Sequence, residues 1–192
     1  MNEDKLKAWF DDTVAQSLKL EKLTRHAQPY QRPKRDRHLT ISKFKALKDQ
    51  VNISKDFQID FVTSERHSSL IENINCLKSI QLDEMKVNKI HSGYFLRCRL
   101  VEDPFLDNAV HCLVEDQEKN IEYLDLFNLW EETGLGNCKI NDFFTKDITI
   151  LIKEPYLKLR KINQIGDDEF SIHCDSPTDL IIINESNRTL NE

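Results

Sequence analysis

Short apolar runs with a period of two dominate the second half of the chain. In the stretch KIHSGYFLRCRLVED, residues 89–103, apolar side chains fall on every second position, and Arg97 and Arg99 lie between them. The alternating apolar residues are Tyr94, Leu96, Cys98 and Leu100. This alternation places the two sets of side chains on opposite faces of a β-strand. The pattern therefore predicts a sheet with one buried face.

Six further runs of this kind follow before residue 185. They read AVHCLVED, IEYLDLFN, ITILIKE, YLKLRKI, EFSIHC and DLIIIN. Residues 129–147, LWEETGLGNCKINDFFTKD, interrupt the series and predict a short helix with a loop. Three strands, a helical interruption and further strands is the order of an OB-fold, a five-stranded barrel. Sandwiches and SH3-like barrels are built from similar short runs, so the pattern leaves these folds open as well.

The N-terminal part has helical spacing instead. Leu6, Trp9, Phe10, Val14 and Leu18 fall near one helix face, which predicts an amphipathic helix at residues 1–26. Residues 27–38, AQPYQRPKRDRH, contain two prolines and predict an exposed basic linker. Residues 39–88 are predicted as a helical or irregular segment with a short helix at 42–50. The predicted fold class is thus α+β: N-terminal helices, then a small OB-like antiparallel β-barrel at 89–184 and a tail at 185–192.

The sequence offers few groups for catalysis. It contains no GxGxxG, GxxxxGK[ST], HExxH or GxSxG motif. His111 and His173 stand opposite the apolar rows of their strands, so we predict that they face solvent, and Cys174 should pack in the core. The carboxylate pair Glu115–Asp116 lies at a strand end and is predicted to be solvated. We expect no catalytic residue, no cofactor and no metal site.

Cysteine content and hydropathy bear on the compartment. The five cysteines are an odd number without close spacing, which favours reduced thiols in the nucleus or cytoplasm. No stretch approaches the roughly 20 apolar residues that span a bilayer, and the charged start MNEDKLKAWFDD predicts neither a signal peptide nor a membrane partner.

Charge is distributed unevenly along the chain. Residues 1–60 carry 13 Lys and Arg against 9 Asp and Glu, whereas residues 89–184 carry 10 against 18. An acidic barrel is a poor surface for phosphates, so any nucleic-acid contact would use the basic segment 25–37. The candidate residues for nucleic-acid binding or nuclear import are Arg32, Lys34, Arg35 and Arg37. The alternative interpretation of this segment is a solvated linker.

Three phrases in order resemble a known family. They are SLIENINCLKSIQLDEMKVNKIHSGYFLRCRL, LVEDQEKNIEYLDLFN, and ILIKEPYLKL followed by IHCDSPTDLIII. Together, over about Leu70 to Ile183, they resemble the segment ahead of the tetratricopeptide repeats in TPR-and-SET-domain proteins, a protein lysine methyltransferase family. Tyr94, Asn120 and Phe127 depart from the pattern, which has arginine, glycine and tyrosine there.

The family's activity cannot be placed on this chain. The NHSC-like and GEE-like motifs of a SET domain are missing from the sequence, and no 34-residue repeat period is visible. The chain therefore resembles the leading module alone. Within that module, Lys153 and Glu154 of KEP and Asp175 of DSPTD are predicted to be structural polar residues.

The leading functional hypothesis is a non-catalytic interaction or scaffold module that docks to a protein. Leu6, Trp9 and Phe10 are the predicted docking anchor, although the same helix face could pack on its own barrel. One alternative is nucleic-acid binding through residues 25–37. The other is that the chain is the N-terminal part of a SET-domain protein lysine methyltransferase.

Overall fold

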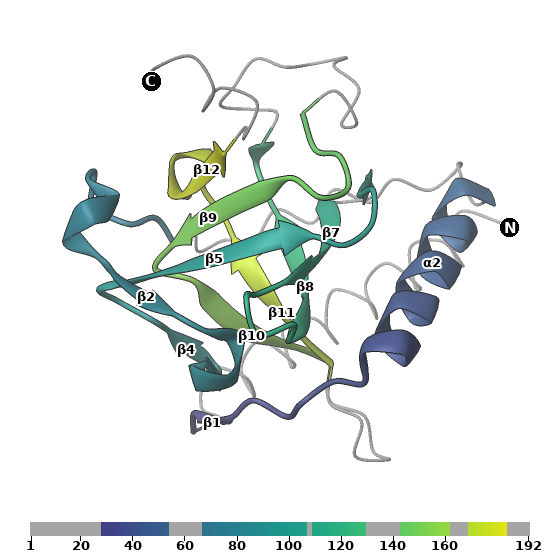
Figure 1. Ribbon diagram of the computed structural model, residues 1–192, viewed down its shortest axis with the longest axis horizontal. Helices are drawn as coiled ribbons and strands as arrows, with labels where there is room; N and C mark the ends of the chain where they lie inside the picture. Colours follow the sequence, from purple (N-terminus) through teal and green to yellow (C-terminus); the bar gives the residue numbers. More distant parts are fainter. Residues whose placement is uncertain (1–27, 54–66, 107–108, 130–142, 162–168, 184–192) are drawn as a thin grey trace, which may run out of the picture.

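Strand β5, Tyr94–Leu100, lies at the centre of the fold and pairs with three other strands. The computed structural model describes residues 28–53, 67–106, 109–129, 143–161 and 169–183, and within them the fold is mostly β with one α-helix (Figure 1). The neighbours of β5 are β2 (Lys78–Ile80, parallel), β7 (Val110–Glu115, antiparallel) and β9 (Thr149–Lys153, antiparallel).

The other strands extend this sheet in both directions. Strand β7 also pairs with β6 (Phe105–Leu106) and β8 (Ile121–Leu126), and β8 runs parallel to β11 (Glu169–Cys174). Strand β10 (Tyr156–Lys161) lies between β11 and β4 (Lys89–Ile90), and β12 (Leu180–Ile183) pairs with β9. A separate small ladder joins β1 (Tyr30–Gln31) to β3 (Lys86–Val87).

A sharp bend connects β9 to β10, because only Glu154 and Pro155 separate them. Glu154 has a φ of 44°; its N–H donates to the Tyr94 carbonyl at 2.8 Å, and its carboxylate accepts from the Gly93 N–H at 2.8 Å. Gly93 has a φ of 81°, a backbone conformation that glycine adopts without steric cost. The pairings run from β9 through β5, β7, β8 and β11 to β10, and the bend joins β10 to β9 along the chain.

His91 fixes the backbone around this bend. Its Nδ1 lies 3.0 Å from the Pro155 carbonyl, and its Nε2 accepts from the Lys86 N–H at 3.0 Å. Those roles require a neutral ring with the proton on Nδ1. Burial lowers the pKa of His91, which agrees with the neutral form.

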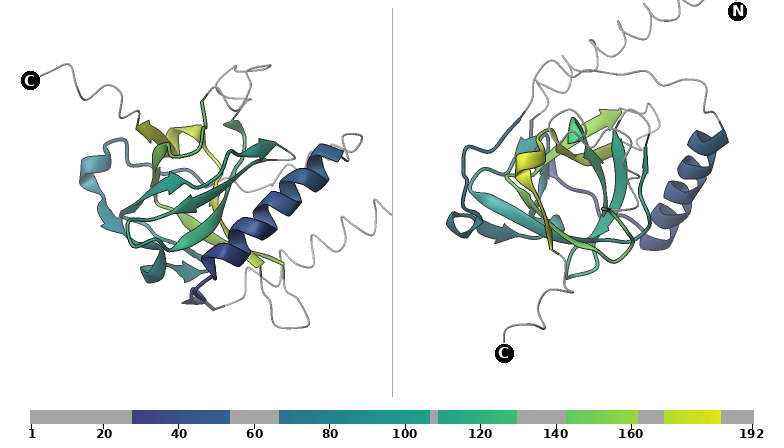
Figure 2. Two further views of the ribbon diagram at one scale, coloured as in Figure 1. Left: turned by 45° about the vertical axis from the view of Figure 1, so that its right-hand side comes forward. Right: turned by 90° about the horizontal axis from the view of Figure 1, so that it is seen from above.

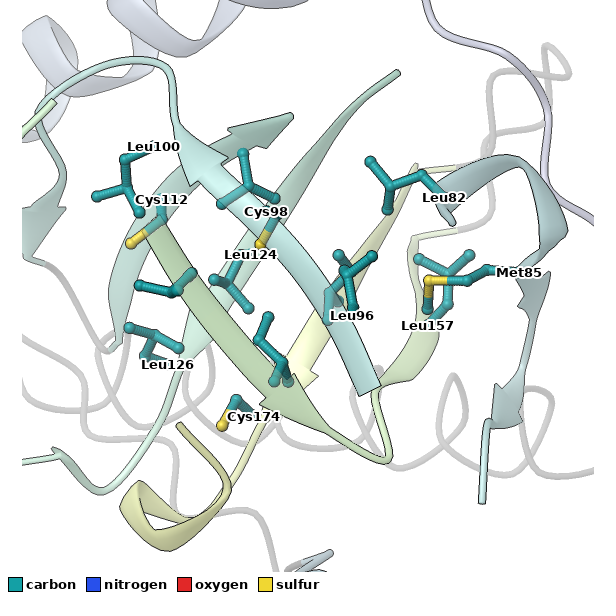
Figure 3. Close-up of a cluster of buried hydrophobic side chains, with 14 of the residues drawn as sticks. Leu82, Met85, Leu96, Cys98, Leu100, Cys112, Leu124, Leu126, Leu157 and Cys174 are labelled. Carbon is teal, nitrogen blue, oxygen red and sulfur yellow. The ribbon is translucent and has the colours of Figure 1, made fainter. Parts of the chain in front are cut away.

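The inward-facing side chains form one large apolar core (Figure 3). Alternate residues of β5, β7 and β8 supply much of it, as the period-two pattern predicts. Buried cysteines contribute as small apolar side chains, and burial raises the pKa of Cys174 to about 12. The core residues from these strands are Leu96, Cys98, Leu100, Val110, Cys112, Val114, Leu124 and Leu126.

Charged residues of the KEP and DSPTD phrases hold the segment that leads into the sheet. Lys153 Nζ donates to the Ile71 carbonyl at 3.0 Å and lies 3.7 Å from Asp179 Oδ1. Asp179 accepts from the Ser69 N–H at 2.9 Å, and Asp175 accepts from the His67 N–H at 3.1 Å. These contacts agree with the structural role predicted for Lys153 and Asp175, as the Gly93 contact does for Glu154.

Several predictions need correction. The sheet is not purely antiparallel, because β2 pairs with β5 and β8 pairs with β11 in parallel. The core includes Ile80, Leu82, Met85 and Val87, so part of the segment predicted as helical or irregular belongs to the β-domain. The short helix predicted at 42–50 is longer and begins inside the predicted linker: α2 spans Arg37–Ile53.

Some predictions lie outside the described residues. These are the N-terminal helix at 1–26, the tail at 185–192 and most of the predicted helical interruption at 129–147. Among the described helices, α2 included, there is none with the length and apolar character to cross a bilayer.

Candidate docking site under helix α2

Helix α2 covers the outer face of the β7–β8 hairpin (Figure 2). Phe44 is its one fully buried side chain among the large apolar residues, and it packs with Val101, Leu113 and Ile121. Its ring centroid lies 5.2 Å from that of Phe105 and 6.4 Å from that of Tyr123. The contact is thus a small second core on the opposite side of the sheet from the main one.

The basic segment before α2 is fastened to the same hairpin. Arg32 Nε lies 2.8 Å from Glu122 Oε2, and Arg35 Nε lies 2.6 Å from Glu122 Oε1. Arg32 also donates to the Ile121 carbonyl, and Arg35 Nη2 donates to the Phe170 carbonyl at 2.8 Å. The prediction of an exposed linker is therefore wrong at Arg32, which is 6% exposed.

Aromatic rings complete the site around Arg35. Its guanidinium carbon lies 4.8 Å from the centroid of Tyr123 and 4.2 Å from that of Phe170, distances at which a cation is attracted by the ring face. Of the four residues predicted to bind nucleic acid, the structure thus brings Arg32 and Arg35 together on one carboxylate. Lys34 is exposed, and Arg37 contacts a second carboxylate, Glu115.

Three cationic side chains contact Glu115. Arg37 Nη2 lies 3.0 Å from Oε2, Lys119 Nζ lies 3.0 Å from Oε1, and Arg99 donates to the same Oε1. Burial by itself raises the pKa of Glu115, but hydrogen bonds from Arg99, Lys119 and Arg37 outweigh it and lower the pKa to about 2. The predicted solvation of Glu115 and Asp116 is wrong, because they are 1% and 4% exposed.

Two hollows flank α2. One, of about 290 Å³, lies by the Arg37–Glu115 pair and is lined also by Ile41 and Val101. The other, of about 250 Å³, lies between the helix and β8 and β11, where Leu47, Tyr123 and Phe170 line it. The helix is therefore seated on the sheet along a narrow line of contact.

A polar cluster continues the same outer face beyond the helix. His111 Nδ1 lies 2.7 Å from Asp125 Oδ1, Ser171 Oγ donates to Asp125 Oδ2 at 2.6 Å, and His173 Nε2 lies 3.6 Å from that oxygen. The prediction that His111 and His173 face solvent is wrong: His111 is 8% exposed and the His173 side chain 10%. Their faces were predicted correctly, but that face is covered.

This cluster resembles a serine–histidine–aspartate triad only in composition. The single hydroxyl proton of Ser171 goes to Asp125, whereas a nucleophilic serine must give it to a histidine base. Ser171 and Asp125 are also buried, with 0% and 1% of their surface exposed. Over the described ranges, there is no group of three histidine, cysteine or carboxylate side chains that could hold a metal ion.

Sequence reasoning missed Glu122, Glu115 and Asp125 as organising residues. Glu122 stands where the alternation places an inward side chain, opposite Val114 in the hairpin register. A carboxylate at an inward position is the signal that could have revealed a buried ionic contact. The predicted docking anchor Leu6, Trp9 and Phe10 lies outside the described residues.

Comparisons with known proteins give distant similarities. No family model matches the sequence. The chain is 26% identical over 111 residues, or 58% of its length, to a Gibberella zeae protein described as a methyltransferase, and spans 14% of that protein. The solved structure of Schizosaccharomyces pombe Pot1pC bound to ssDNA matches 58% of this chain and 90% of its own, with 12% identity and a TM-score of 0.36.

Proposed function

We propose that the chain is a non-catalytic protein-docking module built on an OB-like barrel. The strand order supports the barrel: β5, β7, β8, the bent β9–β10 and β11 are five strands whose pairings return to β5. In this order β7 and β8 are the second and third strands. OB-folds that bind oligonucleotides or oligosaccharides use the face of these two strands.

The observation that carries the proposal is that α2 covers this face. Phe44 packs on the apolar surface of β7 and β8. The arginines of the preceding segment are paired with carboxylates of the same hairpin: Arg32 and Arg35 with Glu122, and Arg37 with Glu115. An OB-fold that binds single-stranded nucleic acid needs an open basic groove with aromatic side chains on which the bases stack. Here the aromatic side chains, Tyr123 and Phe170, hold Arg35 of the chain itself. The face is thus suited to polypeptide rather than to phosphates.

A binding titration tests this proposal against nucleic-acid binding. Labelled single-stranded DNA and RNA are titrated with the whole chain at low salt, and fluorescence anisotropy is measured. We expect no saturable binding. Saturable binding with a steep negative salt slope, reduced by Lys34→Ala, would contradict the proposal, because Lys34 is exposed and its loss leaves the fold intact. Gln117→Ala, at an exposed position in the β7–β8 turn, is the matched control.

The second candidate function is the leading part of a TPR/SET-type protein lysine methyltransferase. The similarity to the Gibberella zeae methyltransferase over 111 residues favours it. In such a protein the module would dock, and residues elsewhere would carry the catalysis. Sequencing the transcript beyond the codon for Glu192 tests this candidate: tetratricopeptide and SET coding sequence there supports it, and a stop codon at that point removes it.

A further inference from the structure

We infer that the outer face of β7 and β8 is a receptor for a basic amphipathic helix with one aromatic anchor, and that α2 occupies it in exchange with such a helix of a partner protein. This inference rests on the proposed docking function and names the class of partner. Three features carry it: the chemistry of the face, the chemistry of its present occupant, and the way the occupant is held.

The face combines an apolar centre with an acidic surround. Val101, Leu113 and Ile121 form the centre under Phe44. Around them, Glu115 receives Arg37, and Glu102 lies 3.1 Å from Lys45 Nζ. Lys48 donates to the backbone carbonyl of Asp103 at 3.0 Å. Glu115 and Glu102 offer carboxylates to a cationic ligand that also has an apolar side.

The occupant has the complementary chemistry. Helix α2 carries Arg37, Lys43, Lys45 and Lys48 against one acid, Asp49. Phe44 is buried, whereas Leu39 and Leu47 are 55% and 45% exposed. The helix therefore presents a single aromatic anchor amid basic residues, which is the helix-in-groove mode of recognition.

The way α2 is held makes exchange feasible. It has one fully buried large side chain, and hollows of about 290 and 250 Å³ lie beside it. Its ion pairs, Arg37–Glu115 and Lys45–Glu102, involve cations that are 42% and 57% exposed in their side chains. Ion pairs whose cation remains partly in water contribute less than fully buried pairs and are screened more by salt. The main core, in contrast, contains no residue of α2.

A peptide-complementation experiment tests the inference. The probe is a labelled peptide of residues 35–53, and the receptor is the whole chain with Phe44→Ala, which weakens its own α2. We expect saturable binding to the Phe44→Ala chain, with shifts of the Leu113 and Ile121 methyl resonances. The peptide should bind the unmodified chain at least about 10-fold more weakly, because the chain's own α2 competes for the face.

Control peptides establish the mode of binding. A peptide with Phe44→Ala should bind on the order of 10- to 100-fold more weakly, because it lacks the anchor. A peptide with Leu39→Ala should bind as the original does, since Leu39 points outward. No binding to a folded Phe44→Ala chain, or equal loss with both control peptides, would overturn the inference.

Two further measurements keep the inference testable and separate it from the proposed function. If Phe44→Ala prevents folding, Ile41→Ala serves as the receptor, and native-state hydrogen exchange is measured on the unmodified chain. Exchange of α2 while β8 stays protected supports the inference, and exchange of both only in one global event overturns it. Oligonucleotide binding to the Phe44→Ala chain would overturn both proposals, whereas failure of the peptide alone would overturn only this one.

Discussion

Glu115 and Glu122 flank the β7–β8 turn, and their cationic partners differ in exposure. The two glutamates are 1% and 0% exposed, and both bind arginines from residues 32–37. The Arg32 side chain on Glu122 is 1% exposed, whereas the Arg37 and Lys119 side chains on Glu115 are 42% and 62% exposed. The pKa values move in opposite directions accordingly.

At Glu122 burial raises the pKa, and Arg35 and Arg32 offset only part of that shift. At Glu115 the three cations lower the pKa to about 2 despite burial. Partners that stay in water have lost little of their own hydration, so the carboxylate gains their attraction at small cost. Glu122 is therefore a buried anchor for the basic segment, while Glu115 is a partly solvated ionic contact at the edge of that segment.

The largest effect should come from Glu122→Gln. This change leaves Arg32 buried without its anion, which costs about 3–5 kcal/mol in the free energy of unfolding. Urea unfolding followed by circular dichroism measures it. Glu118→Gln, at an exposed position of the same turn, is the control and should change stability by less than about 0.5 kcal/mol. A cost near that of the control would mean that Arg32 is solvated in the variant. The two carboxylates would then not differ in the exposure of their partners.

Glu115→Gln should cost less, about 1–2 kcal/mol, because its three cations remain partly solvated after the carboxylate charge is lost. The same unfolding experiment measures this difference. If Glu115→Gln proved as costly as Glu122→Gln, exposure of the partners would not be the deciding factor.

The pH dependence of stability should separate the two carboxylates by sign. The pKa of Glu115 falls from 4.5 to about 2 on folding, so its contribution is complete above about pH 4.5 and lost as the pH falls to about 2. The raised pKa of Glu122 has the opposite effect: the folded chain binds that proton first, so this site favours folding as the pH falls through its raised value.

Urea midpoints across the acidic range test that sign. Between pH 4.5 and 2 the unmodified chain should lose more stability than Glu115→Gln. Just above pH 4.5, protonation of Glu122 should stabilise the unmodified chain less as the pH rises. The Glu122→Gln variant should not show this decrease in stability. Parallel curves for all three proteins would show that neither carboxylate titrates differently on folding.

The strands were predictable from sequence, and the ionic anchors were not. Alternation in β5, β7 and β8 identified the inward residues because each strand has one covered apolar face. The same reasoning assigned His111 and His173 to solvent. The sequence of one strand cannot reveal that Asp125 of β8 pairs with His111 of β7 on one side and with His173 of β11 on the other. Likewise, prolines and basic residues read as a linker, because Glu122 is 90 residues away from Arg32. Long-range pairing, rather than local propensity, decided these positions.

The smallest expected effect is a difference in salt dependence. The cost of Arg37→Gln should be about 0.5 kcal/mol at low salt and vanish at about 1 M, where the screening length falls to roughly 3 Å. The cost of Arg32→Gln should change little with salt, because its pair is buried. Unfolding at both salt concentrations checks this, and equal screening of the two pairs would contradict the distinction.

A double-mutant cycle between Arg32 and Glu122 tests most directly whether the basic segment is part of the folded domain. The free energies of unfolding of the unmodified chain, Arg32→Gln, Glu122→Gln and the double variant give the coupling. We predict that the double variant costs at least about 2 kcal/mol less than the sum of the two single changes. A coupling near zero would mean that the segment is not docked on the β7–β8 hairpin, and that its arginines are free for another ligand.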